Sequence, residues 1–136
     1  TWQQRSIALP AKENNALNFA PRVLIVDESS ESREVLSTLL ARRGATTLEA
    51  LGPKQAVQLA DLHEFDLIVF DADSDHSGTG AGLDDVNAAA NRNGTPIVIL
   101  GTVRQMPQRL VAGQIVSKPY HYGPLVDKIE DLLAAA

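Results

Sequence analysis

The sequence predicts an α/β domain in which a doubly wound, five-stranded parallel sheet lies between two layers of helices. Three short apolar runs, VLIV, LIVF and IVIL, alternate along the chain with amphipathic segments. A strand buried on one face alternates apolar and polar residues, whereas an unbroken run is typical of a strand covered on both faces. The 136 residues, 44% hydrophobic and 21% charged, have the length and composition of one globular domain.

Five strands are expected, and helical patterns separate them, which makes a series of βα units. The strands are predicted near residues 22–27, 45–50, 66–71, 96–101 and 114–117. Parallel neighbours need crossover connections, and these are almost always right-handed. We therefore expect helices on both faces of the sheet.

The helical patterns follow the strands in order. The first is expected to end at Gly44, and the second to begin at Pro53, because glycine ends helices and proline suits their first turn. The third is predicted near 82–92, and the fourth, near 104–111, is short and interrupted by Pro107. The apolar faces of the first, second and last helices are expected to be Val35, Leu36, Leu39, Leu40, Ala56, Val57, Ala60, Leu125, Ile129, Leu132 and Leu133.

The domain is predicted over residues 21–136. Residues 1–20 show no sustained periodicity and are interpreted as a linker or the tail of a preceding domain. The chain begins with Thr1 rather than Met, which favours a piece of a longer protein or a processed product.

Charge and composition exclude several classes of function. Twelve basic and seventeen acidic residues give a net charge of -5, which disfavours direct binding to nucleic acid. No cysteine is present, so a disulfide framework and a thiolate metal site are excluded. The apolar runs are far shorter than the roughly 20 residues that span a bilayer. We expect a cytoplasmic domain without a membrane segment.

Charged residues follow three of the predicted strands. Asp27 and Glu28 follow VLIV, and Lys118 follows IVS. In the segment LIVFDAD, Asp71 directly follows the apolar run and Asp73 comes two residues later. In open parallel sheets, ligands bind beyond the carboxyl ends of the strands. Carboxylates gathered there repel each other, and Mg²⁺, which takes one or two carboxylates and phosphate oxygens, would relieve that repulsion. A lysine beside them suits a phosphoryl group, so the pattern predicts an acyl-phosphate site with one Asp as nucleophile.

Residues 22–121 resemble the receiver domain of two-component response regulators. The likeness is carried by VLIVDESSESREVLSTLLARRGATTLEA, FDLIVFDAD, PIVILG and IVSKPY, in that order. The resemblance implies the flavodoxin-like strand order 2-1-3-4-5 and a bacterial phosphorelay function. A histidine kinase or histidine phosphotransfer domain would supply the phosphoryl group. The domain would be a signalling module rather than an enzyme, and a homodimer is left open.

The resemblance also implies a role for each charged residue. Asp71 would be the phosphoacceptor, and Asp27, Glu28 and Asp71 would hold Mg²⁺. Asp73 would offer its backbone carbonyl to the metal. Lys118 would contact the phosphoryl group, placed by a peptide bond to proline that is often cis in this family.

Four positions depart from the family pattern. Glu28 is one methylene longer than the usual Asp. Gly101 stands where Ser or Thr normally binds the phosphoryl group, so Thr102 is a candidate substitute only if the strand ends there. Ile115 replaces an aromatic residue, and Asp75 stands where proline is usual. The acidic residues are mostly retained, whereas the switch residues are not.

The loop after Asp71 is acidic and rich in glycine. Asp73 and Asp75 are interpreted as solvated acids and His76 as a solvated histidine. Three glycines in G-x-G-x-G spacing are interpreted as a sign of flexibility: Gly78, Gly80 and Gly82.

Three alternatives compete with phosphoryl acceptance. The first is a pseudo-receiver, an interaction module that no longer switches. The second is a phosphatase of the haloacid-dehalogenase type, suggested by the Asp-x-Asp of IVFDAD, although that family places this motif on its first strand. The third is flavin binding, which two carboxylates after the first strand disfavour, because they would face the phosphate.

Overall fold

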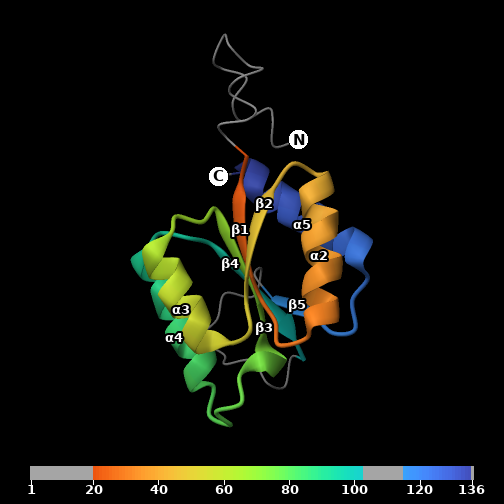
Figure 1. Ribbon diagram of the computed structural model, residues 1–136. Coiled ribbons are helices and arrows are strands. Elements are labelled where there is room, and N and C mark those ends of the chain that lie inside the picture. The colour runs from red at the N-terminus through yellow and green to blue at the C-terminus, as the bar shows by residue number, and fades with distance from the viewer. Residues whose placement is uncertain (1–19, 103–114, 136) are drawn as a thin grey trace.

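The computed structural model describes residues 20–102 and 115–135, which form a five-stranded parallel sheet of order β2-β1-β3-β4-β5 (Figure 1). Its strands are β1 Arg22–Val26, β2 Thr46–Ala50, β3 Leu67–Asp71, β4 Ile97–Gly101 and β5 Ile115–Ser117. Each strand lies within its predicted range, and the strand order is confirmed. The expectations for residues 1–19 and for a fourth helix near 104–111 lie outside the described residues.

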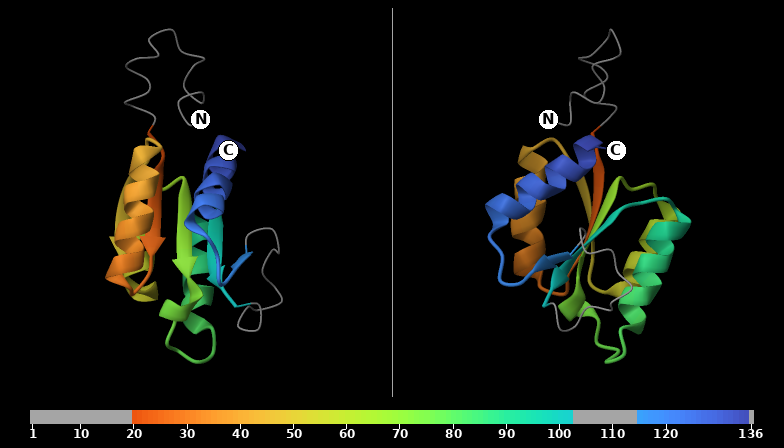
Figure 2. Two further views of the ribbon diagram at one scale, coloured as in Figure 1. Left: turned by 90° about the vertical axis from the view of Figure 1, so that its right-hand side faces the viewer. Right: turned by 180° about the vertical axis from the view of Figure 1, so that it is seen from behind.

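Helices cover both faces of the sheet. They are α2 Ser30–Arg42, α3 Pro53–Leu62, α4 Ala81–Arg92 and α5 Tyr122–Ala135, and a short 3₁₀ turn, η2 Ala72–Ser74, follows β3. Helices α2 and α5 lie on one face, and α3 and α4 lie on the other (Figure 1 and Figure 2). The predicted doubly wound α/β fold is therefore confirmed.

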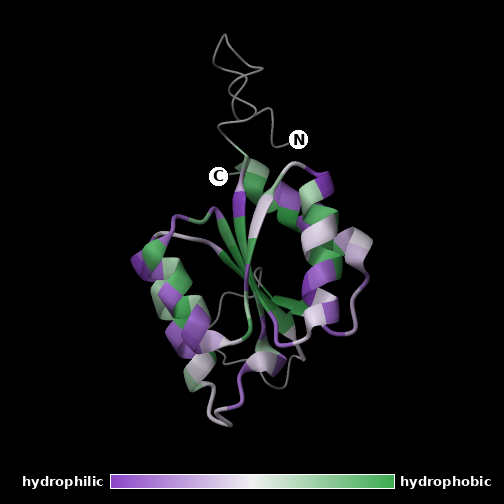
Figure 3. Ribbon diagram, viewed as in Figure 1, coloured by the Kyte–Doolittle hydropathy of each residue, from purple (hydrophilic) through white to green (hydrophobic). Residues whose placement is uncertain are grey.

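The central strands contribute side chains to two separate cores. In β1, Val23 and Ile25 pack toward α2 and α5, whereas Leu24 and Val26 pack toward α3 and α4. Successive strand residues point to opposite faces, so a strand between two helix layers needs apolar residues at every position. Figure 3 shows this as apolar strands between helices whose outer faces are polar.

The first helix has a narrower apolar face than predicted. Leu36 and Leu40 are buried and Leu39 is partly buried, but Val35 is 36% exposed. Neighbouring helical residues are about 100° apart around the axis, so a stripe centred on Leu36 and Leu40 leaves Val35 at its edge. The expected C-terminal end of this helix is confirmed, because Gly44 follows it with a φ of 95°.

The loop before α4 is held by a carboxylate. Asp75 accepts hydrogen bonds from the backbone N of Ser77 (3.0 Å) and of Leu83 (2.9 Å). Partial burial raises the pKa of Asp75, but hydrogen bonds to its carboxylate outweigh burial and hold the pKa below its usual value. The prediction of Asp75 as a solvated acid is wrong, because the residue satisfies backbone donors at the start of a helix.

Gly82 is needed for close packing rather than for flexibility. A Cβ at this position would lie 2.6 Å from Asp75 Oδ1 and 2.7 Å from Pro53 Cγ. The interpretation as a flexible glycine is therefore wrong here, although Gly78 and Gly80 do have positive φ angles of 75° and 81°.

We expect Gly82→Ala to lower the free energy of unfolding by about 1–2 kcal/mol, because overpacking displaces a hydrogen-bonded carboxylate. Gly123→Ala is the matched control, since Gly123 is also the second residue of a helix and its Cβ would meet nothing within 4 Å. Urea denaturation measures both. Equal stabilities of the two variants would contradict the packing role of Gly82.

Candidate functional site

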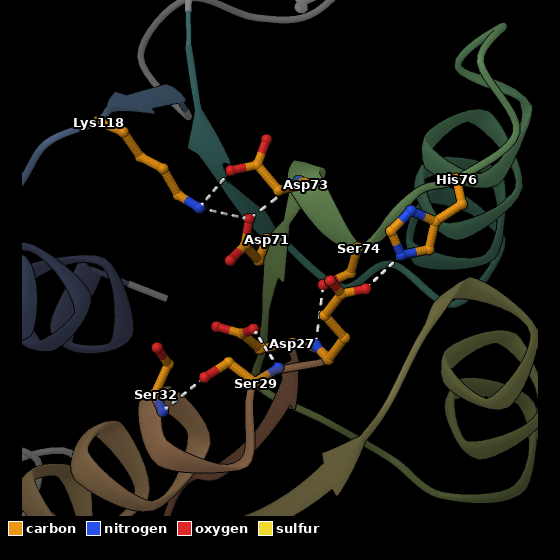
Figure 4. Close-up of polar contacts among 9 residues, drawn as sticks. Asp27, Ser29, Ser32, Asp71, Asp73, Ser74, His76 and Lys118 are labelled. Atoms are coloured by element: carbon orange, nitrogen blue, oxygen red, sulfur yellow. Dashed lines mark hydrogen bonds and ion pairs between the residues drawn. The ribbon is translucent and has the colours of Figure 1, made fainter.

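Two buried carboxyl groups lie side by side at the carboxyl ends of β1 and β3 (Figure 4). Val26 pairs with Phe70 in parallel register, so the residues that follow them, Asp27 and Asp71, are neighbours. Asp27 is 5% exposed and Asp71 is 7% exposed. Sheet register thus brings together two acids that are far apart in the sequence.

A lysine that follows the edge strand β5 completes this cluster of charged side chains. The cluster of Asp27, Asp71 and Lys118 at the strand ends is called the crevice. Lys118 follows β5, and its backbone N donates to the carbonyl of Gly101 (3.0 Å). Its peptide bond to Pro119 is cis. The Nζ of Lys118 lies 2.8 Å from Asp71 Oδ1. The structure therefore brings Asp27, Asp71 and Lys118 into one crevice, which is what the positions of the strand ends predict.

Burial and neighbouring charges shift the pKa of the Asp27 carboxyl group. Burial, aided by the neighbouring Asp71, raises the pKa of Asp27 to about 6. A hydrogen bond from the backbone N of Ser29 and the charge of Lys118 act in the opposite direction. At neutral pH the crevice holds more negative charge than one lysine balances, and a bound cation would relieve this excess.

Lys118 is shared between two carboxylates. It donates to Asp71 Oδ1 and also to Asp73 Oδ2, at 2.7 Å. Burial lowers the pKa of Lys118, but the bonds to both carboxylates outweigh burial and raise it. The side chain of Asp73 is 47% exposed, in line with its interpretation as a solvated acid, but it is also ion-paired with Lys118. The backbone N of Asp73 also donates to Asp71 Oδ1 (2.9 Å).

Glu28 is held by the loop that follows β3. Its backbone N donates to the hydroxyl of Ser74 (2.9 Å), and its carboxylate contacts the imidazole of His76. Ser74 is 3% exposed, and the sequence reasoning did not single it out. His76 is exposed, as its interpretation as a solvated histidine requires, and the sequence did not indicate its contact with Glu28.

Thr102 is an exposed residue directly after β4, which ends at Gly101. The end of the strand at Gly101 meets the condition under which Thr102 could supply the hydroxyl that Gly101 lacks. Its contact with a phosphoryl group stays a prediction.

Of the described residues, the carboxylates at the strand ends suit Mg²⁺ in number but do not form a larger ligand cluster. Among residues 20–102 and 115–135, no three His, Asp or Glu side chains are grouped closely enough to hold a metal ion. Mg²⁺ typically takes only one or two carboxylates and completes its shell with water. Asp27 and Asp71 are neighbouring carboxylates that suit such a site, whereas the carboxylate of Glu28 contacts His76. A contact of the Asp73 backbone carbonyl with the ion stays a prediction.

Solved structures similar to this chain share one fold. The signal receiver domain of a signal transduction histidine kinase from Syntrophus aciditrophicus has a TM-score of 0.73 and 22% identity, over 86% of this chain and 92% of that one. The chain has the receiver-domain fold. The receiver domain of Francisella response regulator 1452 has a TM-score of 0.67 and 19% identity, over 85% and 98% of the two chains.

A third receiver domain, that of the response regulator PhyR from Erythrobacter litoralis, has a TM-score of 0.69 and 18% identity, over 85% and 91% of the two chains. No protein-family model and no curated protein sequence matches this chain. These similar receiver domains come from signalling proteins, namely response regulators and a histidine kinase. Within the described part of the chain, no helix has the length and apolarity that a membrane crossing requires.

Proposed function

We propose that this receiver domain accepts a phosphoryl group on Asp71 in a bacterial phosphorelay, with Mg²⁺ as cofactor. The donor would be the phosphohistidine of a histidine kinase or of a histidine phosphotransfer domain. One observation carries the proposal: Asp71 is buried beside a second carboxyl group and lies 2.8 Å from the ammonium of Lys118.

The contacts around Asp71 orient it as a nucleophile. Lys118 Nζ and the backbone N of Asp73 both donate to Oδ1, which fixes the plane of the carboxylate. Attack by Asp71 forms an O–P bond, and the P–N bond of phosphohistidine breaks with its electron pair passing to the imidazole nitrogen. Mg²⁺ held by Asp27 and Asp71 would neutralise charge on the phosphoryl oxygens.

Lys118 supplies the positive charge that the acyl phosphate needs. In the unphosphorylated domain its ammonium is bound by Asp71 and Asp73. A phosphoryl group on Asp71 brings new oxygens to the same place, and we expect Lys118 to exchange a carboxylate for one of them. Charge-assisted hydrogen bonds of this kind are stronger than neutral ones.

Incubation with acetyl phosphate and Mg²⁺ tests the proposal. We expect intact mass spectrometry to detect one phosphoryl adduct on the wild-type chain and none on Asp71→Asn. Asp131→Asn, which removes an exposed acid of α5, is the control and should retain the adduct. An unmodified wild-type chain, or an adduct that persists in Asp71→Asn, would refute phosphoryl acceptance on Asp71.

A pseudo-receiver is the second candidate, and a specific observation favours it. Gly101 is buried at the end of β4 and has no hydroxyl to follow the arrival of a phosphoryl group, while Ile115 replaces the aromatic switch residue of the family. Phosphorylation signals by biasing a two-state element. Absence of the adduct from a folded wild-type chain would support this reading.

A further inference from the structure

We propose that His76 regulates the cation affinity of this site by holding the Glu28 carboxylate away from Asp27 and Asp71. This inference rests on the proposed function, because it assigns a regulatory residue to the same Mg²⁺ site. The Glu28–His76 pair is called the latch below. It joins the loop after β1 to the loop after β3.

In the latch, the backbone of Glu28 is held by a hydrogen bond, whereas its side chain is exposed and can move. The backbone N of Glu28 is bonded to Ser74, which is 3% exposed, so the backbone position is fixed. The side chains of Glu28 and His76 are 51% and 73% exposed. Exposed ion pairs contribute little free energy, so the Glu28 carboxylate can leave His76 without disturbing the fold.

The latch lies on the other side of the strand ends from the crevice. Glu28 and His76 line a groove between α3 and α4, together with Leu51 and Pro53, whereas Asp27 and Asp71 do not line it. Figure 4 shows His76 beyond Ser74, on the side away from Lys118. While the latch is closed, a carboxylate next in sequence to Asp27 is directed into the groove.

Opening the latch would supply the crevice with a third carboxylate. Glu28 directly follows Asp27, and a rotation of its side chain leaves the backbone hydrogen bond to Ser74 in place. A cation bound by Asp27 and Asp71 attracts any nearby carboxylate. His76 and the cation therefore compete for Glu28. Breaking the contact between Glu28 and His76 costs free energy, and this cost weakens cation binding by the same amount.

We expect His76→Ala to bind Mn²⁺ and Mg²⁺ about two- to fivefold more tightly than the wild-type chain, the range that breaking an exposed pair allows. Binding is measured on the full chain from the electron paramagnetic resonance signal of free Mn²⁺, with Mg²⁺ as competitor. His63→Ala is the matched control, since His63 is an exposed histidine at the end of α3, and its affinity should equal that of the wild type.

A second pair of variants separates the latch from a merely structural effect of His76. Glu28→Gln alone should bind cation no more tightly than the wild type, because it opens the latch without adding a carboxylate to the crevice. In the His76→Ala background, Glu28→Gln should remove the whole gain. A gain that survives Glu28→Gln, or unchanged or weaker binding by His76→Ala, would overturn the inference.

The two proposals fail in different ways. A wild-type chain that binds Mn²⁺ yet forms no adduct on Asp71 refutes phosphoryl acceptance and leaves the latch measurable. A chain that forms the adduct but shows equal affinity in His76→Ala refutes the latch alone. Failure of both the wild type and His76→Ala to bind either cation overturns the latch outright.

Discussion

Asp27→Asn is expected to stabilise the folded domain by about 1–2 kcal/mol at neutral pH in the absence of divalent cations. Burial, aided by Asp71, raises the pKa of Asp27 from 3.8 to about 6, a difference that corresponds to roughly 3 kcal/mol at most. The amide keeps the oxygen that accepts from the backbone N of Ser29. We expect about half of that limit, because Asn still buries a polar group.

The pH dependence follows from the direction of this shift. Between the unfolded value of 3.8 and the folded value of about 6, the folded state binds more protons than the unfolded state. The contribution of Asp27 to wild-type stability therefore falls as pH rises through this window, and Asp27→Asn should lose this part of the pH dependence. Near pH 4 the two chains should be about equally stable.

Urea denaturation with a chelator present, at several values between pH 4 and neutrality, measures this difference. Asp131→Asn serves as the control, because surface substitutions usually change stability by less than about 0.5 kcal/mol. A lower stability of Asp27→Asn at neutral pH would contradict the destabilising role of this carboxyl group. An acid that weakens the fold while lining a crevice is typical of a functional site.

The fold could be predicted because it depends on local patterns. Unbroken apolar runs require burial on both faces, and the strands at Val23–Val26, Leu67–Phe70 and Ile97–Leu100 are all buried. The proximity of Asp27 and Asp71 could be predicted from the same strand pattern. Once the strands are parallel and adjacent, the register alone makes Asp27 a neighbour of Asp71.

The partners of the loop side chains could not be predicted in the same way. The loop after β3 takes its course from the positive φ angles of Gly78 and Gly80 and from contacts with segments remote in sequence. His76 meets Glu28, 48 positions away, and Asp73 meets Lys118, 45 positions away. No periodic pattern in the sequence indicates such pairs. From the sequence alone, each acid in this loop is therefore predicted to be solvated.

The packing role of Gly82 is a similar case. In the sequence it is one of three glycines with regular spacing, and nothing distinguishes it from Gly80. Only the approach of Pro53, from the start of α3, makes its missing side chain a requirement. The sequence does not distinguish a glycine that adopts a positive φ, such as Gly80, from one that leaves room for a neighbouring side chain, such as Gly82.

Lys118→Met is expected to destabilise the domain by about 2 kcal/mol at neutral pH, and to abolish the adduct on Asp71. Removing one member of a buried ion pair costs about 3–5 kcal/mol. The Lys118 side chain is 25% exposed, so solvent screening makes the loss smaller. Methionine retains most of the apolar stem, and the change therefore reports mainly on the charge that balances Asp27 and Asp71.

A double-mutant cycle isolates this charge. In an Asp71→Asn background the crevice holds one carboxylate fewer, so Lys118→Met should cost only about 1 kcal/mol, and the difference is the coupling between the two residues. Lys54→Met, on the exposed surface of α3, should change stability by less than about 0.5 kcal/mol. Equal losses in the wild-type and Asp71→Asn backgrounds would show that Lys118 contributes by packing, and that the charges of the crevice are not balanced by its ammonium.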